Sequence, residues 1–165
     1  MKKICAMLLL TVLLLCLTTA ASAQTSGAVA TQNNIIQTLG AEKNLKTFTG
    51  ALEKSGMRDT LATGGPYTIF APTDDAFNRV PANTLNTIMA DQTRTTGLIR
   101  NHIVQGRYDI KDLANMGYVT TLDGKTLQIT SAGTAFAVDG AHIIKQDIPA
   151  GNGIIHVVDM VMVPK

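Results

Sequence analysis

Cysteine, tryptophan and aromatic residues in general are scarce in this chain. The two cysteines are Cys5 and Cys16, tryptophan is absent, and aromatic residues make up 4% of the sequence. A protein that keeps only the residues after position 23 therefore has no thiol, which excludes disulfides, thiol catalysis and thiolate metal ligands. So few aromatic rings also argue against stacking platforms for sugars or nucleic-acid bases.

An excess of one charge is lacking as well. Lysine and arginine number 14 against 12 aspartates and glutamates, and Lys2 and Lys3 account for the formal net charge of +2. No run of like charges occurs, so we predict no basic face for nucleic acid or anionic lipid.

The beginning of the chain has the pattern of a cleavable signal peptide. Residues 1–3 are a short basic start, residues 4–17 are an apolar run, and Ala21-Ser22-Ala23 fits a small-residue cleavage site. The run is shorter than the roughly 20 apolar residues that span a bilayer, so we expect cleavage after Ala23 rather than a retained membrane anchor. The protein is then secreted or periplasmic.

Residues 24–32 are small and polar and are predicted to form a flexible leader, followed by a single domain over residues 33–165. A lipoprotein anchored at Cys16 is the less favoured alternative, because the bulky Leu15 precedes that cysteine.

The first half of the domain has apolar residues at helical spacing. Two short helices are predicted on either side of Gly40, and Gly56 ends the second. Residues 67–71 form a short buried strand. Thr73 is then placed to cap the next helix, and the negative charge of Asp74 suits its first turn.

Further helices are predicted from Pro81 and over residues 95–103. After Gly106 the pattern changes to strands joined by Asp-Gly turns, which is a strong hairpin signal. The predicted strand segments are 119–122, 126–129, 135–138, 142–144 and 153–163. We expect the last of them to complete an antiparallel set. Helices followed by strands predict an α+β domain.

Three segments in this order resemble the fasciclin domain family across residues 35–164. They are Thr68-Ile69-Phe70-Ala71-Pro72-Thr73-Asp74, the stretch from Leu98 to Gly106, and Asn152-Gly153-Ile154-Ile155-His156-Val157-Val158-Asp159. The resemblance implies a wedge-shaped, twisted β-sandwich with helices packed along it. It also implies an extracytoplasmic adhesion or interaction module.

The resemblance also points to particular residues. In animal members, the central segment and an Asp-Ile pair before the last signature form integrin-linked surfaces. The corresponding candidate partner-binding residues here are Asn101, His102, Asp147 and Ile148, with Asn101 standing where the family has a tyrosine. Residues with an expected structural role in the signatures are Thr73, Asp74, His156 and Asp159.

The three histidines are weighed separately. His156 lies in an apolar strand and His102 on the apolar side of a helix, so we expect both to be buried and hydrogen-bonded, with metal or haem ligation as the alternative. His142 follows a turn and is expected to be solvated. Asp159 falls on the opposite strand face from His156, which disfavours a catalytic pair. No metal or cofactor is predicted.

No sequence pattern indicates an enzyme. The chain has no nucleophile elbow, phosphate loop or dinucleotide fingerprint, so no catalytic residue is assigned. The leading hypothesis is a secreted, non-enzymatic module that binds a protein or polysaccharide at the cell surface or in the extracellular matrix. The alternatives are a periplasmic carrier of haem or metal, through His102 or His142, and an undetected hydrolase.

Overall fold

The structure is a computed structural model that describes residues 33–163. The predicted signal peptide and leader lie outside the described residues. The helices are α2 (Ile35–Ala41), α3 (Lys46–Lys54), α4 (Arg58–Thr63), α5 (Asp74–Arg79), α6 (Ala82–Ala90), α7 (Gln92–Asn101) and α8 (Ile110–Met116). The strands are β1 (Tyr67–Pro72), β2 (Ile103–Gln105), β3 (Tyr118–Thr120), β4 (Thr126–Ala132), β5 (Ala135–Val138), β6 (Ala141–Ala150) and β7 (Gly153–Val158).

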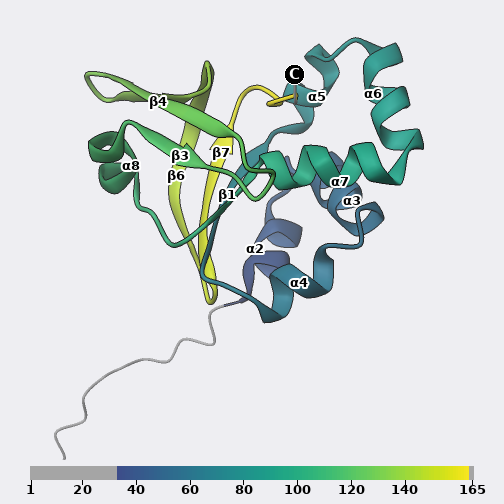
Figure 1. Cartoon of the computed structure of the whole chain (residues 1–165), viewed down its shortest axis with the longest axis horizontal. Helices are drawn as coiled ribbons and strands as arrows, with labels where there is room; N and C mark the ends of the chain where they lie inside the picture. The colour runs from purple at the N-terminus through teal and green to yellow at the C-terminus, as the bar shows by residue number, and fades with distance from the viewer. Residues whose placement is uncertain (1–32, 164–165) are drawn as a thin grey trace, which may run out of the picture. The chain divides into compact units, whose positions relative to one another are not determined.

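Within residues 33–163 the strands form one seven-stranded sheet in the order β2-β1-β7-β6-β5-β4-β3. A bridge between Val104 and Thr121 brings the two ends of this order together, so the sheet nearly closes into a barrel. Helices α2, α3, α4 and α7 lie together beside β1 (Figure 1). The predicted α+β class is confirmed, and the predicted sandwich is matched in part.

The prediction that the last strand completes an antiparallel set is wrong. β7 pairs antiparallel with β6, but it pairs parallel with β1, with Phe70 opposite His156. The strand also ends at Val158 and not at Val163. Because β7 has a strand on each side and packed side chains on both faces, all six of its residues are buried.

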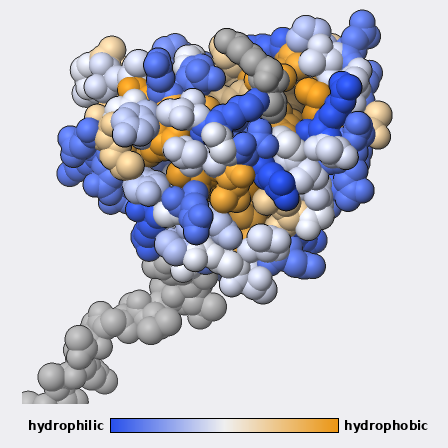
Figure 2. All heavy atoms as spheres, viewed as in Figure 1, coloured by the Kyte–Doolittle hydropathy of each residue, from blue (hydrophilic) through white to orange (hydrophobic). Residues whose placement is uncertain are grey.

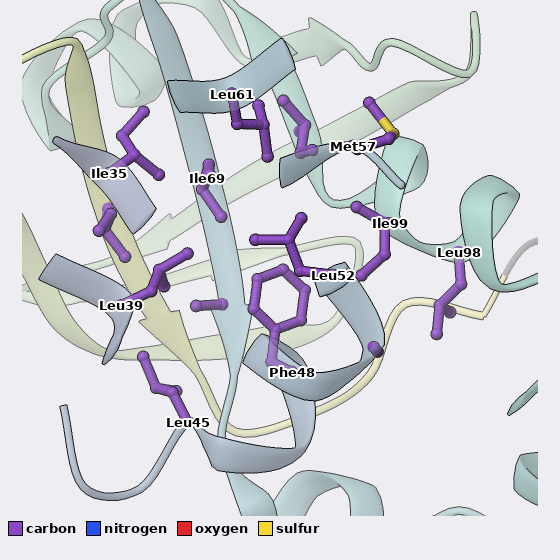
Figure 3. Close-up of a cluster of buried hydrophobic side chains, with 14 of the residues drawn as sticks. Ile35, Leu39, Leu45, Phe48, Leu52, Met57, Leu61, Ile69, Leu98 and Ile99 are labelled. Atoms are coloured by element: carbon purple, nitrogen blue, oxygen red, sulfur yellow. The ribbon is translucent and has the colours of Figure 1, made fainter. Parts of the chain in front are cut away.

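Alternation along β1 and β7 divides the core into two clusters, since successive strand side chains point to opposite faces. Ile69 and Ile155 pack against the helices in the first cluster, whereas Phe70 and Val158 belong to the second, inside the curled sheet. Figure 3 shows the first cluster, where side chains from α2, α3, α4 and α7 meet Ile69 of β1.

The helices of the described part are short. None of those within residues 33–163 combines the length and apolar character needed to cross a bilayer. Their ends depend on specific caps, and Thr73 is one of these. The hydroxyl of Thr73 accepts a hydrogen bond from the backbone N–H of Ala76 at 3.2 Å, as predicted for the start of α5.

Replacing Thr73 with alanine is expected to lower the free energy of unfolding by about 1 kcal/mol, because an N–H of the first turn of α5 loses its acceptor. Thr73→Ser keeps the hydroxyl and should cost a few tenths of that amount. Denaturant unfolding of the two variants measures the difference. Equal midpoints for wild type and Thr73→Ala would remove this cap from the account.

Candidate functional site

The polar residues of the first and last signature segments converge on the loop of residues 106–109, between β2 and α8. The backbone N–H of Tyr108 donates to the hydroxyl of Thr68 at 3.0 Å. That hydroxyl donates in turn to the carbonyl of Gly106 at 2.8 Å. The carbonyl of Tyr108 lies 3.1 Å from Nε2 of His156. The loop is therefore held from two neighbouring strands, β1 and β7.

His156 is fully buried, and both of its ring nitrogens have backbone partners. Nδ1 accepts from the N–H of Asp147 at 3.3 Å, which leaves Nε2 to carry the proton that is donated to Tyr108. The ring stacks on Phe70 at a centroid separation of 5.6 Å. Burial lowers the pKa of His156, against weaker raising effects from the Tyr108 carbonyl and nearby carboxylates. The imidazole is therefore neutral at neutral pH.

The pairing of β6 with β7 shifts register twice, between Ile143 and Lys145 and between Lys145 and Ile148, and Asp147 lies within the second shift. Its backbone is left-handed, with φ at 55°. Its carboxylate accepts from the N–H of Ile110 at 2.9 Å and so caps α8. The N-cap residue of that helix, Asp109, makes no such bond. Ile148 is half-buried, whereas the side chain of Asp147 is 42% exposed.

Asn101 and His102 are buried and hold the segment that follows β7. The Asn101 amide donates to the carbonyl of Met162 at 2.9 Å, and Nε2 of His102 accepts from the N–H of Met162 at 3.1 Å. Nδ1 of His102 donates to the carbonyl of Leu98 at 2.8 Å. The side chains of two consecutive residues thus bind both the N–H and the carbonyl of Met162, as a neighbouring strand would.

The four candidate partner-binding residues therefore occupy different environments. Asn101 is 3% and His102 0% exposed, so a partner that binds the folded surface does not reach their side chains. Asp147 and Ile148 lie where β6 is irregular and include an exposed carboxylate. Of the four residues, only Asp147 is exposed, and Ile148 is half-buried.

Asn152, the first residue of the last signature segment, has a structural role that the sequence pattern did not assign to it. Its side-chain carbonyl accepts from the N–H of Ile35 at 2.9 Å, at the start of α2. Its amide donates to the carbonyls of Leu61 and Gly64 at the end of α4. One side chain in the β6–β7 turn therefore caps two helices. The match to the last signature segment was the only signal in the sequence.

Asp74 and Asp159 also bind distant backbone. The carboxylate of Asp74 accepts from the N–H of Thr47 at 2.8 Å and caps α3, whose own N-cap residue makes no side-chain bond. Burial opposes ionisation of Asp74, but the hydrogen bonds from Thr47 and the charge of Lys46 leave its pKa lowered. The carboxylate of Asp159 accepts from the N–H of the exposed His142 at 2.8 Å.

Comparison with known proteins identifies this architecture. The family model for the Fasciclin domain matches residues 43–164. The chain belongs to the fasciclin family. It is 34% identical over 133 residues to transforming growth factor-beta-induced protein ig-h3 of Sus scrofa. The matched region covers 80% of this chain and 20% of that protein. The chain thus spans about a fifth of the length of ig-h3.

Two further proteins are similar to this chain, and the match covers a larger share of each of them than of ig-h3. The chain is 33% identical over 129 residues to the uncharacterized protein sll1735 of Synechocystis, covering 78% of this chain and 96% of that protein. A solved FAS1 domain pair from the insect cell adhesion molecule fasciclin I superposes with a TM-score of 0.59 at 20% identity, over 73% of this chain and 46% of that chain. This last similarity shows the fold.

The fasciclin domain offers no cluster suited to a metal within residues 33–163, where no three His, Cys, Asp or Glu side chains come together. A metal or haem bound through His102 would have to displace Leu98 or Met162 from the ring nitrogens. The arrangement of polar groups is that of a scaffold whose side chains fix backbone segments far apart in the sequence.

Acid is expected to destabilise this fasciclin domain through its buried histidines. Burial lowers the pKa of His102 from 6.5 to about 4. Between these two values the unfolded chain takes up a proton that the folded protein does not, so the free energy of unfolding falls as pH falls, by roughly 3 kcal/mol in total. Below about pH 4 both states are protonated and His102 contributes no further loss.

Denaturant unfolding at several pH values between 7 and 4 measures this dependence. The variant His102→Gln removes the titrating group. Its free energy of unfolding should therefore fall less steeply between pH 7 and pH 4 than that of wild type, whatever its absolute stability. Wild-type stability that does not change across the range, or identical slopes for both proteins, would contradict the assignment of His102 as a buried neutral residue.

Proposed function

We propose that this fasciclin domain is a secreted, non-enzymatic interaction module that binds a protein or polysaccharide at the cell surface or in the extracellular matrix. The observation that carries the proposal is that polar side chains of the signature segments bind the protein's own backbone. Both ring nitrogens of His102 and of His156 face backbone partners, and the amide of Asn152 links two helices. These groups serve the scaffold, which leaves the surface to act by binding.

The alternative, a periplasmic haem or metal carrier, has less support. His102 is enclosed and already hydrogen-bonded at both nitrogens, and His142 is exposed without neighbouring ligand residues in a cluster within the described part of the chain. Secretion is supported by the N-terminal sequence pattern. A solved relative by fold, fasciclin I, is a cell adhesion molecule of insects.

The proposed contact surface includes the irregular part of β6 around Asp147 and Ile148. Residues 144–147 form an exposed run, with Ile144 61% exposed. A bulge of this kind re-aims side chains and interrupts the pairing of a strand. It gives β6 an apolar and a negatively charged group on an accessible segment.

Binding to extracellular matrix preparations tests the proposal, with Asp147→Asn as the variant. Asparagine tolerates the left-handed backbone and keeps a carbonyl for Ile110, so the change isolates the charge. Asp139→Asn is the matched control, because Asp139 is also exposed and has φ at 49°. We expect several-fold weaker binding for Asp147→Asn and unchanged binding for the control.

Two results would contradict the proposal. One is a native protein that stays in the cytoplasm in cell fractionation. The other is wild-type protein that binds neither protein nor polysaccharide components of the matrix. If wild-type protein binds and both aspartate variants bind equally well, the module function stands and the contact surface around Asp147 is wrong.

A further inference from the structure

A groove of about 300 Å³ lies where the curled sheet nearly closes, between β2, the loop of residues 106–109, the end of α8 and β3. The residues that line it include Gln105, Tyr108, Met116, Tyr118 and Thr120. None of its lining side chains is charged. By contrast, the hollow beside α6 and α7 includes Arg94 and Asp123. The groove therefore suits a neutral ligand.

The groove gathers two of the three tyrosines of the chain. Tyr118 is 61% exposed, which is unusual for so large a side chain, and the neighbouring Met116 is 43% exposed. The low aromatic content predicts no stacking platform for sugars, but two of the few aromatic rings lie together in this groove. Figure 2 shows that apolar residues are exposed among polar ones on the face that Figure 1 presents.

Tyr108 is held in position by the fasciclin signatures. Its N–H is bound by Thr68 and its carbonyl by His156, both of them fully buried. Its ring packs on Gly106, where a Cβ atom would approach the ring to 2.6 Å. One side of the groove is thus fixed before any ligand binds, which lowers the cost of binding.

The far side of the groove is fixed through α8. Asp147 caps the first residue of that helix, and Gly117, with φ at 71°, ends it directly before β3. Val119 is buried between the exposed Tyr118 and Thr120 and anchors the strand in the second core cluster. Thr68 and His156 thus support one side of the groove, and Asp147 supports the other.

We propose that this groove binds a neutral sugar residue of a polysaccharide. A pyranose ring presents a face of C–H groups, which packs on an aromatic ring, and a rim of hydroxyls, which require hydrogen-bonding side chains. Tyr108, Tyr118 and Met116 supply the first, and Gln105 and Thr120 the second. The absence of a charged lining residue disfavours acidic glycans and charged peptides. The inference rests on the proposed function and narrows it to polysaccharide.

Isothermal titration of the purified chain with neutral hexasaccharides of glucose and of N-acetylglucosamine tests the site, with polygalacturonate as the anionic probe. We expect binding of a neutral hexasaccharide, weaker by about tenfold in Tyr118→Ala and largely retained in Tyr118→Phe. Gln105→Ala should also weaken binding. Because tryptophan is absent, tyrosine fluorescence provides a second readout of the same titration.

Met160→Ala is the matched control, because Met160 is also an exposed apolar residue, at 47%, but lies after β7, outside both the groove and the proposed contact surface. It should leave sugar binding unchanged. Equal affinity of wild type and Tyr118→Ala for a neutral hexasaccharide would overturn the site. Preference for polygalacturonate would overturn the ligand class.

The same proteins separate this inference from the proposed function. Wild-type protein that binds matrix proteins but no hexasaccharide overturns the sugar site and leaves the module function standing, even if Tyr118 contributes to the protein contact. Wild-type protein that binds no matrix component of either class overturns both.

Discussion

Replacing Gly153 with alanine is expected to prevent stable folding. Gly153 begins β7 opposite Tyr67 in the parallel pair, and a Cβ atom there would overlap the carbonyl oxygen of Tyr67 and lie 2.7 Å from Cδ1 of Ile35. The first contact is with backbone, so no side-chain rotation relieves it. Relief requires separating β7 from β1, at a cost of roughly 5 kcal/mol or more, which is a large part of the stability of a typical domain.

Gly50→Ala provides the control for this prediction. Gly50 lies within α3, and a Cβ atom there meets nothing within 4 Å. Alanine should raise the free energy of unfolding by about 0.5–1 kcal/mol, because it is the better helix former. Circular dichroism and denaturant unfolding compare the two variants. A folded Gly153→Ala protein with wild-type stability would show that β1 and β7 are not paired as described.

Replacing His156 with alanine is expected to cost about 4 kcal/mol. The change leaves the N–H of Asp147 and the carbonyl of Tyr108 without their partner, at roughly 1–3 kcal/mol for each buried group, and adds a cavity beside Phe70. His142→Ala is the comparison, because the His142 side chain is exposed and only its backbone binds Asp159. It should change stability by no more than about 0.5 kcal/mol.

Unfolding in urea, followed by circular dichroism, measures both histidine variants under one set of conditions. The free energy of unfolding should depend on urea concentration with the same slope in both variants, so their midpoints can be compared directly. Small and equal losses of stability would mean that His156 does not hold the loop of residues 106–109. The groove at Tyr108 would then lose its main support.

Much of the secondary structure follows from local rules, and these could be read from the sequence. The helical spacing before Gly56, the Thr73 cap and the Asp-Gly hairpins each depend on residues within a few positions of one another. The burial of His102 and His156 also follows, since each lies among apolar neighbours. The structure agrees with these expectations because local preference and tertiary packing favour the same conformation.

The features that the sequence did not reveal depend on partners far along the chain. The parallel pairing of β1 with β7 joins segments separated by about half the chain, and nothing in either strand specifies its neighbour. Helix α8 was missed because its cap comes from Asp147, 37 residues away. The caps of α2 and α3 by Asn152 and Asp74 were missed for the same reason.

The predicted last strand was too long for a related reason. Val161 and Met162 are buried and apolar, which resembles a continuing strand in the sequence. In the structure the side chains of Asn101 and His102 bind the backbone of Met162 in place of a strand partner. Hydrophobic pattern alone does not distinguish these two ways of satisfying buried backbone groups.

The protonation of the two buried rings tests most directly whether the signature histidines serve the scaffold. Nitrogen-15 NMR of the imidazoles at pH 7 should find both neutral but in opposite tautomers, with the proton on Nδ1 of His102 and on Nε2 of His156. Rings that interchange tautomers rapidly and titrate near pH 6.5, as in water, would contradict the account.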